Sequence, residues 1–370
     1  MPAWYELKDP NQVDSPALVV YKKRIEQNIN FMTRIVGGDT SRLIPHVKTH
    51  KMAEVVKMQL AAGISKFKCA TIAEAEMLAQ AGAKWVLIAY QLTGPKIDRM
   101  LELIKAYPDV QFGSLIDDRN VAKHLNDYIK GKKASWLIFV DVNVGMNRTG
   151  HAVNSDLLNL YEYVYKLPNL LLAGIHVYDG HIREKFFKDR KVQADQALEQ
   201  LAVLYEFIEI NGLPDPFVIA GGTPTFTVHA LRKGVYCSPG TCLFWDAGYG
   251  DQFREQPFVY AALVLTRVIS KPASGTITLD LGHKAIAAEN PIDKRFRLLN
   301  LPDAELVSQS EEHAVVKVSN WDSISIGDVY YAVPYHICPT VALHGYASVV
   351  EDGEVSEVWE VTARNRKIVH

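Results

Sequence analysis

The segment LIPHVKTHKM, residues 43–52, places two histidines and two lysines directly after a short apolar run. Lys48 follows that run at once, so it would project from a strand end into a partly desolvated site. Desolvation disfavours the ammonium form and leaves an amine that can form a Schiff base with an aldehyde cofactor such as pyridoxal phosphate. The alternative is a solvated loop lysine, because lysines are rarely buried.

A second segment, VIAGGTPT (218–225), has the composition of a phosphate-binding turn. Gly221 and Gly222 allow backbone N–H groups to approach a ligand, and Thr223 is predicted to cap a following helix with Pro224 at its first position. Such a nest of donors at a helix start suits a phosphate. A Gly-Gly turn without a ligand is the alternative interpretation.

Two more loops place polar groups after apolar runs. In VDVNVGMNRTG (140–150), Arg148 could donate to a phenolate or carboxylate and hold it ionised. In GIHVYDGHIR (174–183), Tyr178 could hydrogen-bond a ring nitrogen, and His181 could act as an acid or base near neutral pH. Taken alone, each group also fits a structural or surface role.

The segment VPYHICPTVALH (333–344) carries His336 and Cys338, two positions apart. In a strand both side chains would point to the same face, as two ligands of one metal must. Imidazole and thiolate together favour zinc, and two protein ligands leave sites open for catalysis. The alternative is a buried cysteine beside a core histidine.

These groups need elements that bring them together. Apolar, β-branched runs alternate with helical patterns through the first two thirds of the chain, which predicts a parallel sheet buried on both faces. Eight such units fit a closed (β/α)₈ barrel, where chemistry collects at the carboxyl ends of the strands. The predicted strands are 17–21, 42–47, 66–71, 85–90, 110–117, 135–143, 170–180 and 216–222.

The pattern changes after about residue 245. Alternating runs with turns at Ser274-Gly275 and at residues 351–354 predict an all-β domain. We therefore predict an α/β protein with a barrel domain at 1–245 and a C-terminal β domain at 246–370, with the first fifteen or so residues free to pack with the β domain. The length of 370 residues suits a barrel of ~250 residues plus a second domain.

Composition excludes several function classes. A formal net charge of −2 gives no basic excess for nucleic acid. The first residues lack a basic region followed by an apolar run, and no apolar stretch approaches the ~20 residues that span a bilayer. The four cysteines are scattered, so we expect a cytoplasmic protein without a disulfide framework and without a membrane partner.

The motifs occur together and in order: PHVKTHK, DVNVGMNRTG, HVYDGH, GGTPT, LDLGHKA and HICPTVALH. This set resembles the D-threonine aldolase and D-serine dehydratase family of fold-type III pyridoxal phosphate enzymes, which are related to alanine racemase. The resemblance runs from about residue 15 to the VTARNRK end. It implies a (β/α)₈ barrel of the alanine racemase N-terminal type plus a C-terminal β domain, assembled as a homodimer.

The resemblance also implies roles for residues. It makes Lys48 the lysine of the internal aldimine and His181 an acid–base group. The cofactor-binding residues would be Arg148 at the phenolate oxygen, Tyr178 near the pyridine ring, and Gly221, Gly222 and Thr223 at the phosphate. His336 and Cys338 would hold a divalent metal, with zinc expected ahead of manganese or magnesium.

The implied activity is that of a lyase acting on D-β-hydroxy amino acids, with the metal coordinating the substrate hydroxyl and carboxylate. Retro-aldol cleavage to glycine and an aldehyde is the main prediction. Elimination from D-serine or D-3-hydroxyaspartate to a 2-oxo acid and ammonia is the alternative. Several dehydratases of the family share the H-x-C pair, so Cys338 favours elimination, whereas the run of motifs favours the aldolases.

Two other classes remain open at this point. An amino-acid racemase needs a second base on the opposite face, for which Tyr249 and Tyr335 are the candidates. A non-catalytic pyridoxal phosphate-binding protein would be a single barrel, and the predicted β domain with its metal pair argues against it.

Overall fold

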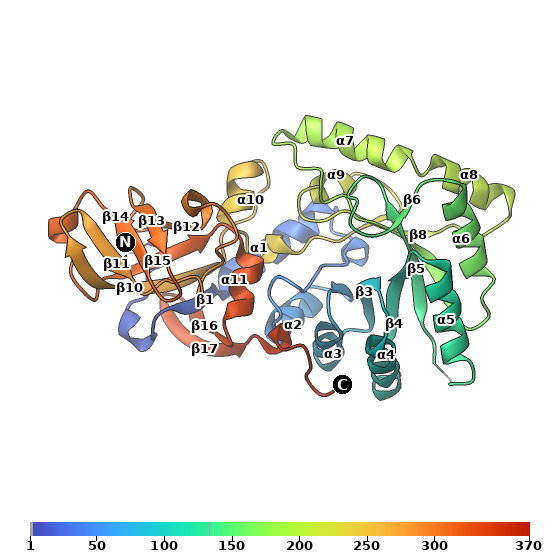
Figure 1. The fold of residues 1–370 in the computed structure, drawn as a ribbon, viewed down its shortest axis with the longest axis horizontal. Helices are drawn as coiled ribbons and strands as arrows, with labels where there is room; N and C mark the ends of the chain where they lie inside the picture. The colour runs from blue at the N-terminus through green and yellow to red at the C-terminus, as the bar shows by residue number, and fades with distance from the viewer. Residues whose placement is uncertain (1–2, 133) are drawn as a thin grey trace. The chain divides into compact units, whose positions relative to one another are not determined.

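The computed structural model describes residues 3–132 and 134–370 (Figure 1). The chain forms two compact units, each discontinuous in sequence. The barrel unit comprises Met32–Lys48, Val56–Gly240 and Asn365–His370. The β unit comprises residues 3–31, Thr49–Val55 and Thr241–Arg364. Helices α1 (Lys22–Ile35) and α2 (Ala53–Ala61) belong partly to each unit.

The barrel unit is built on a parallel sheet whose strands follow one another in space as they do in the chain. Parallel bridges from Leu43 to Cys237 and from His46 to Lys68 join residues 43–46 to both edges of this sheet. The segment predicted as a strand at 42–47 therefore closes the ring. The strands are β2 (Lys66–Cys69), β3 (Trp85–Gln91), β4 (Gln111–Ile116), β5 (Leu137–Asn143), β7 (Leu171–Val177), β8 (Phe217–Ala220) and β9 (Val235–Cys237), and the short β6 (His151–Ala152) pairs with β5.

Helices line the outer face of this sheet, as Figure 1 shows for α3 to α6. Their starts are fixed locally: the Thr71 side chain accepts from the Glu74 N–H, and Asp118 accepts from two backbone N–H groups. Ile44, Leu115 and Phe139 belong to one buried hydrophobic cluster, which is made of side chains from the parallel strands and the ring-closing segment. The helices are α3 (Ile72–Gln80), α4 (Pro95–Ala106), α5 (Arg119–Ile129), α6 (Ser155–Tyr165), α7 (Phe187–Glu199), α8 (Ala202–Ile210) and the single turn α9 (Phe226–His229).

The β unit holds a mostly antiparallel sheet, in the order β13-β14-β11-β10-β1-β16-β17, with β15 pairing with β10 and β12. The predicted turn at 351–354 is a tight hairpin in which Asp352 and Gly353 have φ of 52° and 80°. The strands are β1 (Ala17–Tyr21), β10 (Ala262–Ala273), β11 (Thr276–Leu279), β12 (Phe296–Leu298), β13 (Glu305–Gln309), β14 (Ala314–Lys317), β15 (Val329–Pro334), β16 (Tyr346–Glu351) and β17 (Glu354–Glu360), and the helices are α10 (Ala247–Gln252) and α11 (Ile337–Leu343).

One strand assignment is wrong. The run at 17–21, predicted as the first barrel strand, is β1 of the other sheet, antiparallel to β10 and parallel to β16. Val19 and Val20 are completely buried there, so the run is as continuously apolar as a barrel strand. The strand that the prediction missed is β9, which has only three residues.

The segment around His336 was also assigned wrongly. It was predicted as a strand, but β15 ends at Pro334 and α11 begins at Ile337. His336 occupies the N-cap position, and Asp246 accepts from the Ile337 N–H. Pro339 fits the first turn of a helix, where its missing N–H has no intrahelical partner to lose. His336 and Cys338 are therefore neighbours across a helix start.

Among the described residues, no helix combines the length and the apolar character needed to cross a bilayer.

Candidate active site

A cavity of about 220 Å³ lies at the carboxyl ends of the barrel strands. It brings together Lys48, Arg148 and Tyr178, three residues that the sequence placed after three different strands. The polar side chains that line it are those of His46, Lys48, Lys68, Tyr90, Arg148, Thr149, His176 and Tyr178. Most of these groups are cationic or can become so, which suits an anionic ligand.

Lys48 lies where the ring-closing segment leaves the sheet. The Val47 N–H donates to the Lys68 carbonyl, and the Lys48 N–H donates to Nδ1 of His46 over 3.2 Å. His46 is 8% exposed, so this turn is fixed from the buried side. Lys48 itself is half-buried and reaches the cavity.

Arg148 and Tyr178 form one wall of the cavity. The Arg148 guanidinium carbon is 4.6 Å from the centroid of the Tyr178 ring, within range of a cation–π contact. Arg148 is exposed and Tyr178 is half-buried. The stacking directs the guanidinium toward the space that Lys48 also lines.

A buried chain of hydrogen bonds runs beneath this wall. Lys68 Nζ is 3.3 Å from Nε2 of His176, and Nδ1 of His176 is 2.7 Å from Oδ1 of Asp141. The exposed fractions are 2%, 4% and 3%, respectively. Burial raises the pKa of Asp141, but hydrogen bonds from His176 and Thr149 bring it below its usual value. Asp141 is thus the negatively charged member of this hydrogen-bonded network.

The surroundings of Lys68 perturb its amine strongly. Burial, followed by the charge of Lys48, lowers the pKa of Lys68 to about 7. Burial and the charge of Lys68 also lower the pKa of His176. Because ionised Asp141 fixes the proton on Nδ1 of His176, Nε2 is left to accept a hydrogen bond from the Lys68 amine.

The glycine turn lies against the same wall. Gly221 has φ of +75°, and a Cβ there would meet the His229 ring at 2.5 Å. A Cβ on Gly222 would lie 2.9 Å from the Tyr178 ring, so each glycine leaves no room for a side chain, Gly221 on the His229 side and Gly222 on the Tyr178 side. Thr223 does not cap a helix as predicted. Its Oγ1 accepts from the Gly240 N–H over 3.1 Å, and α9 begins only at Phe226.

A buried carboxylate anchors this turn. The two Asp179 oxygens accept from Thr225 Oγ1 and from Nε2 of His229, each over 2.7 Å. Arg232 donates to the other ring nitrogen of His229, which fixes its tautomer. Burial raises the pKa of Asp179, but the bonds from His229 and Thr225 leave it lower than usual. The turn is therefore held independently of any ligand.

His181 lies elsewhere. It is exposed, and its ring lies against Gly145, where a Cβ would be 2.9 Å from Nε2. His181 is not among the side chains that line the cavity. The histidines that do line it are His46 and His176.

The predicted metal pair lies in the β unit, at the turn between β15 and α11. His336 Nδ1 is 2.5 Å from Oε1 of Glu289, and His336 is also hydrogen-bonded to Cys338. Thr49 Oγ1 is 3.2 Å from the Cys338 sulfur. Burial lowers the pKa of His336, but Cys338 and Glu289, with Asp246 nearby, raise it to about 9.

The donor set of this pair fits a divalent ion with open coordination sites. The imidazole and the sulfur are already within hydrogen-bonding distance, so both can reach one ion. Among the described residues, no group of three or more histidine, cysteine or carboxylate side chains is arranged to hold a metal. A closed structural metal site is therefore not formed by the described residues, and the two-ligand arrangement stays a prediction.

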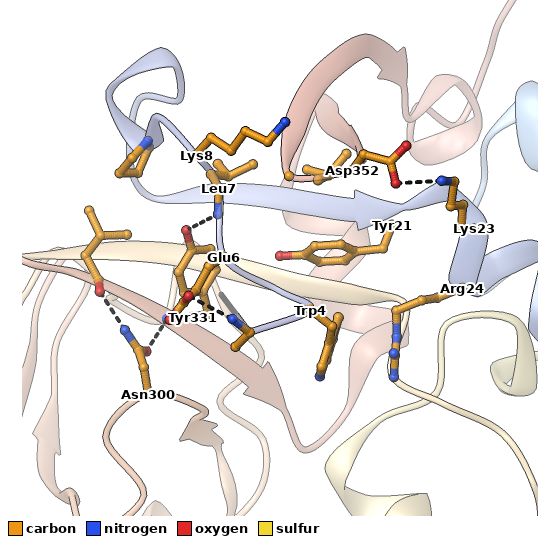
Figure 2. Close-up of a pocket in the computed structure, with 15 residues that line it drawn as sticks. Trp4, Glu6, Leu7, Lys8, Tyr21, Lys23, Arg24, Asn300, Tyr331 and Asp352 are labelled. Carbon is orange, nitrogen blue, oxygen red and sulfur yellow. Dashed lines mark hydrogen bonds and ion pairs between the residues drawn. The ribbon is translucent and has the colours of Figure 1, made fainter. Parts of the chain in front are cut away.

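A larger hollow, of about 780 Å³, lies in the β unit between the N-terminal segment and the sheet (Figure 2). Its polar groups are largely paired with one another. Lys23 binds Asp352, the Leu7 N–H donates to the Tyr331 hydroxyl, and the Arg24 guanidinium covers the Trp4 ring at 3.6 Å. The volume of a hollow is thus a poor guide here, because the convergent cations lie in the smaller cavity.

Comparison with known proteins shows the family of this chain. Residues 20–247, more than half of the chain, match the family model of the alanine racemase N-terminal domain. The chain belongs to the alanine racemase N-terminal domain family. Residues 261–350 of this alanine racemase-like chain match a model of a serine dehydratase-like domain.

Three curated relatives match nearly the whole alanine racemase-like chain. D-threonine aldolase of Arthrobacter sp is 28% identical, covering 95% of this chain and 93% of the relative. 3-Hydroxy-D-aspartate aldolase of Paracoccus denitrificans is 28% identical, covering 97% and 94%. D-threo-3-hydroxyaspartate dehydratase of Delftia sp. is 24% identical, covering 94% and 97%. The similarity therefore spans both the barrel unit and the β unit.

Among solved structures, D-threonine aldolase from Filomicrobium marinum superposes with a TM-score of 0.88 at 26% identity, covering 98% of this chain and 99% of that one. This agreement confirms the predicted barrel and β-sheet architecture of the alanine racemase-like chain.

The residues present fit pyridoxal phosphate. The cavity offers a lysine amine, an arginine, and an aromatic ring against which Gly222 leaves no room for a side chain. Lys48 would bind the aldehyde carbon, Arg148 the phenolic oxygen, and the turn at Gly221–Thr223 the phosphate.

Sequence reasoning missed Lys68 and His229. In KFKC, Phe67 and Cys69 alternate with Lys68, so Lys68 reads as a solvent-facing residue of a half-buried strand. In a closed barrel the second face is the interior, so the same alternation points Lys68 inward. His229 lies in a pattern that reads as an ordinary helix, and no local signal marks it.

The candidates for a racemase base have other partners. The Tyr335 hydroxyl donates to Asp251 over 2.9 Å and also contacts Arg297. Burial and the hydrogen bond to Asp251 raise the pKa of Tyr335, which makes it a weaker acid and harder to use as a phenolate. The Tyr249 ring stacks on that of Trp245.

Proposed function

We propose that this chain is a pyridoxal phosphate- and metal-dependent lyase of the D-threonine aldolase type, which cleaves D-β-hydroxy amino acids to glycine and an aldehyde. The observation that carries the proposal is the full-length similarity to D-threonine aldolase, because it covers both the Lys48 cavity and the His336–Cys338 pair. The superposition on a solved D-threonine aldolase supports it.

The residues of the cavity and of the glycine turn beside Tyr178 would divide the work as follows. Lys48 provides the amine that binds the cofactor aldehyde, and it can hold a proton at Nζ when that bond is exchanged for the substrate. Arg148 stabilises the negative charge of the phenolic oxygen. The backbone of the glycine turn, anchored through Asp179, holds the phosphate. Bound pyridoxal phosphate supplies the electron sink for negative charge at Cα.

His336 and Cys338 would hold the ion. A divalent metal supplies Lewis-acid polarisation of an oxygen substituent, here the β-hydroxyl that both activities require. We propose zinc, because a thiolate selects a softer ion over magnesium. Cys338→Asp is expected to keep some metal and to move the preference toward manganese or magnesium. The acid–base role of His181 stays a prediction, because His181 does not line the cavity.

A dehydratase is the second candidate, favoured by a dehydratase relative that matches over nearly its whole length and by the cysteine in the metal pair. In that case the β-hydroxyl would leave D-serine or D-3-hydroxyaspartate, and the Cα–Cβ bond would stay intact. The two candidates share every group described above.

Product analysis separates these candidates. The purified protein, loaded with pyridoxal phosphate and zinc, is incubated with D-threonine, D-serine and D-3-hydroxyaspartate. Glycine with an aldehyde supports the aldolase, and ammonia with a 2-oxo acid supports the dehydratase. If none of these products forms, the proposal is wrong.

We further propose a cytoplasmic, two-fold symmetric homodimer with an interface above ~2,000 Å². The resemblance to fold-type III enzymes supports the dimer, and the four described cysteines, which form no disulfide bond with one another, support the location. Light scattering on the holoenzyme measures the state, and a fully active monomer at micromolar concentration would contradict it.

A further inference from the structure

The barrel cavity contains two lysine amines, and the proposed function uses one. Lys48 is half-buried and Lys68 is 2% exposed, yet both line the same small space. Burying an ammonium group is costly unless its charge is paired or removed. The surroundings of Lys68 therefore bear on what this second amine does.

The orientation of the Lys68 amine is set by its neighbours. Asp141 accepts from Nδ1 of His176, and Nε2 of His176 then accepts from Lys68 over 3.3 Å. These two hydrogen bonds thus run from Lys68 through His176 to Asp141. The remaining substituent positions on Nζ are left for the cavity that Lys68 lines.

The charges that face Lys68 come from three strand ends. After burial, the charges of Lys48 and Arg148 lower its pKa, whereas those of Asp141 and Asp179 raise it, and the outcome is a pKa of about 7. The other titratable groups that line the same cavity are His46, Tyr90, His176 and Tyr178. Lys68 can therefore exchange a proton near neutral pH.

We propose that Lys68 is a second catalytic base of this cavity, which accepts the proton that a substrate ammonium group must lose before its nitrogen can displace Lys48 from the cofactor. This inference rests on the proposed function. The substrate R–NH₃⁺ gives a proton to the Lys68 amine and becomes R–NH₂. Its nitrogen then bonds to the cofactor carbon, a second proton moves from that nitrogen to the Lys48 nitrogen, the bond from the carbon to the Lys48 nitrogen breaks, and Lys68 passes its proton to the released Lys48 amine.

The experiment measures this exchange without cleavage. The holoenzyme is mixed with D-alanine, which has no β-hydroxyl, and the change in cofactor absorbance is followed as a function of pH. Lys68→Met should slow the exchange at pH 7 by at least about 100-fold, as expected for a lost acid–base group. Added methylamine should restore part of the rate in Lys68→Ala, which a purely structural role would not allow.

Lys66→Met is the matched control. Lys66 lies on the same strand, but its amine is 5.7 Å from the centroid of the Tyr236 ring, and it does not line the cavity. This variant should exchange at the wild-type rate. If Lys68→Met exchanges within about threefold of wild type, or changes only the KM for D-alanine, Lys68 is not a base and the inference is wrong.

A second variant keeps Lys68 and tests how the charge of Asp141 affects its pKa. Because the charge of Asp141 raises the pKa of Lys68, Asp141→Asn should move the acidic limb of the exchange profile to lower pH. A limb that stays in place or moves upward contradicts the inference, even if Lys68→Met fails to fold.

Borohydride reduction and peptide mapping of the wild type separate the two proposals. If no linkage forms at Lys48, both fail, and if it forms but the Lys68 variants exchange normally, only the role of Lys68 fails.

Discussion

The barrel cavity and the His336–Cys338 pair both lie where a strand ends, but they are built differently. The hydrogen-bonded residues Lys68, His176 and Asp141 are almost completely buried and are held by one another. The side chains of His336 and Glu289 are 44% and 48% exposed. The reactivity of the first site comes from desolvation, and that of the second depends on the ion that it would hold.

This difference teaches which changes each site should tolerate. In a desolvated network, removing one charge leaves another buried without compensation, so effects are large and affect pKa values. In a half-exposed ligand pair, water can replace a lost contact, so effects should appear mainly in metal affinity.

The largest effect is expected from Lys48→Ala. The variant loses both the bond to the cofactor and a proton-holding amine, so activity should fall by at least about 10³-fold, in the range seen for positioned acid–base groups. The visible absorbance band and the borohydride-reducible linkage should disappear together. Lys51→Arg is the control and should keep both. A reducible linkage that persists on Lys51 in Lys48→Ala would show that the lysine was assigned wrongly.

The gathering of Lys48, Arg148 and Tyr178 could be predicted because the carboxyl ends of parallel strands meet at one end of a barrel. Apolar, β-branched runs marked most of the strands, and a short polar turn marked the hairpin at Asp352–Gly353. Which of the two sheets contains the run at 17–21 could not be predicted. Val19 and Val20 are completely buried in the sheet of the β unit, as they would be in the barrel sheet, so the local sequence pattern does not distinguish between the two sheets.

The inward direction of Lys68 could not be predicted for a related reason. Alternation gives which residues share a face, but only closure of the barrel decides that the second face is an interior. The prediction of a strand around His336 was wrong for a different reason. An apolar run that reads as a strand contains Pro339, and the helix start that Pro favours prevailed.

Removing the metal should have the second-largest effect. Treatment with EDTA, or Cys338→Ala, should lower activity by about 100-fold or more, because Lewis-acid stabilisation is worth several kcal/mol. The visible band of the Lys48 linkage should remain, since its residues belong to the other unit. Zinc content is measured by atomic absorption, with Cys237→Ala as the control that keeps both metal and activity. Full metal content and activity in Cys338→Ala would make Cys338 an ordinary core cysteine.

The smallest effect is expected from Glu289→Gln. Glu289 accepts a hydrogen bond from Nδ1 of His336, which holds the ring in place and leaves Nε2 as the nitrogen that can bind a metal. The amide can still contact the ring but carries no charge, so zinc affinity should fall by about 10-fold, at the low end for groups that orient a ligand.

Competition with a chromophoric chelator measures this affinity, and activity should return to the wild-type value at saturating zinc. The matched control is Glu312→Gln, which removes a carboxylate from an exposed pair with Lys284 in the same unit. A loss of affinity as large as that of Cys338→Ala would mean that Glu289 binds the ion itself. A site with three protein ligands would follow, and the contrast with the barrel cavity would then be weaker than the two-ligand arrangement indicates.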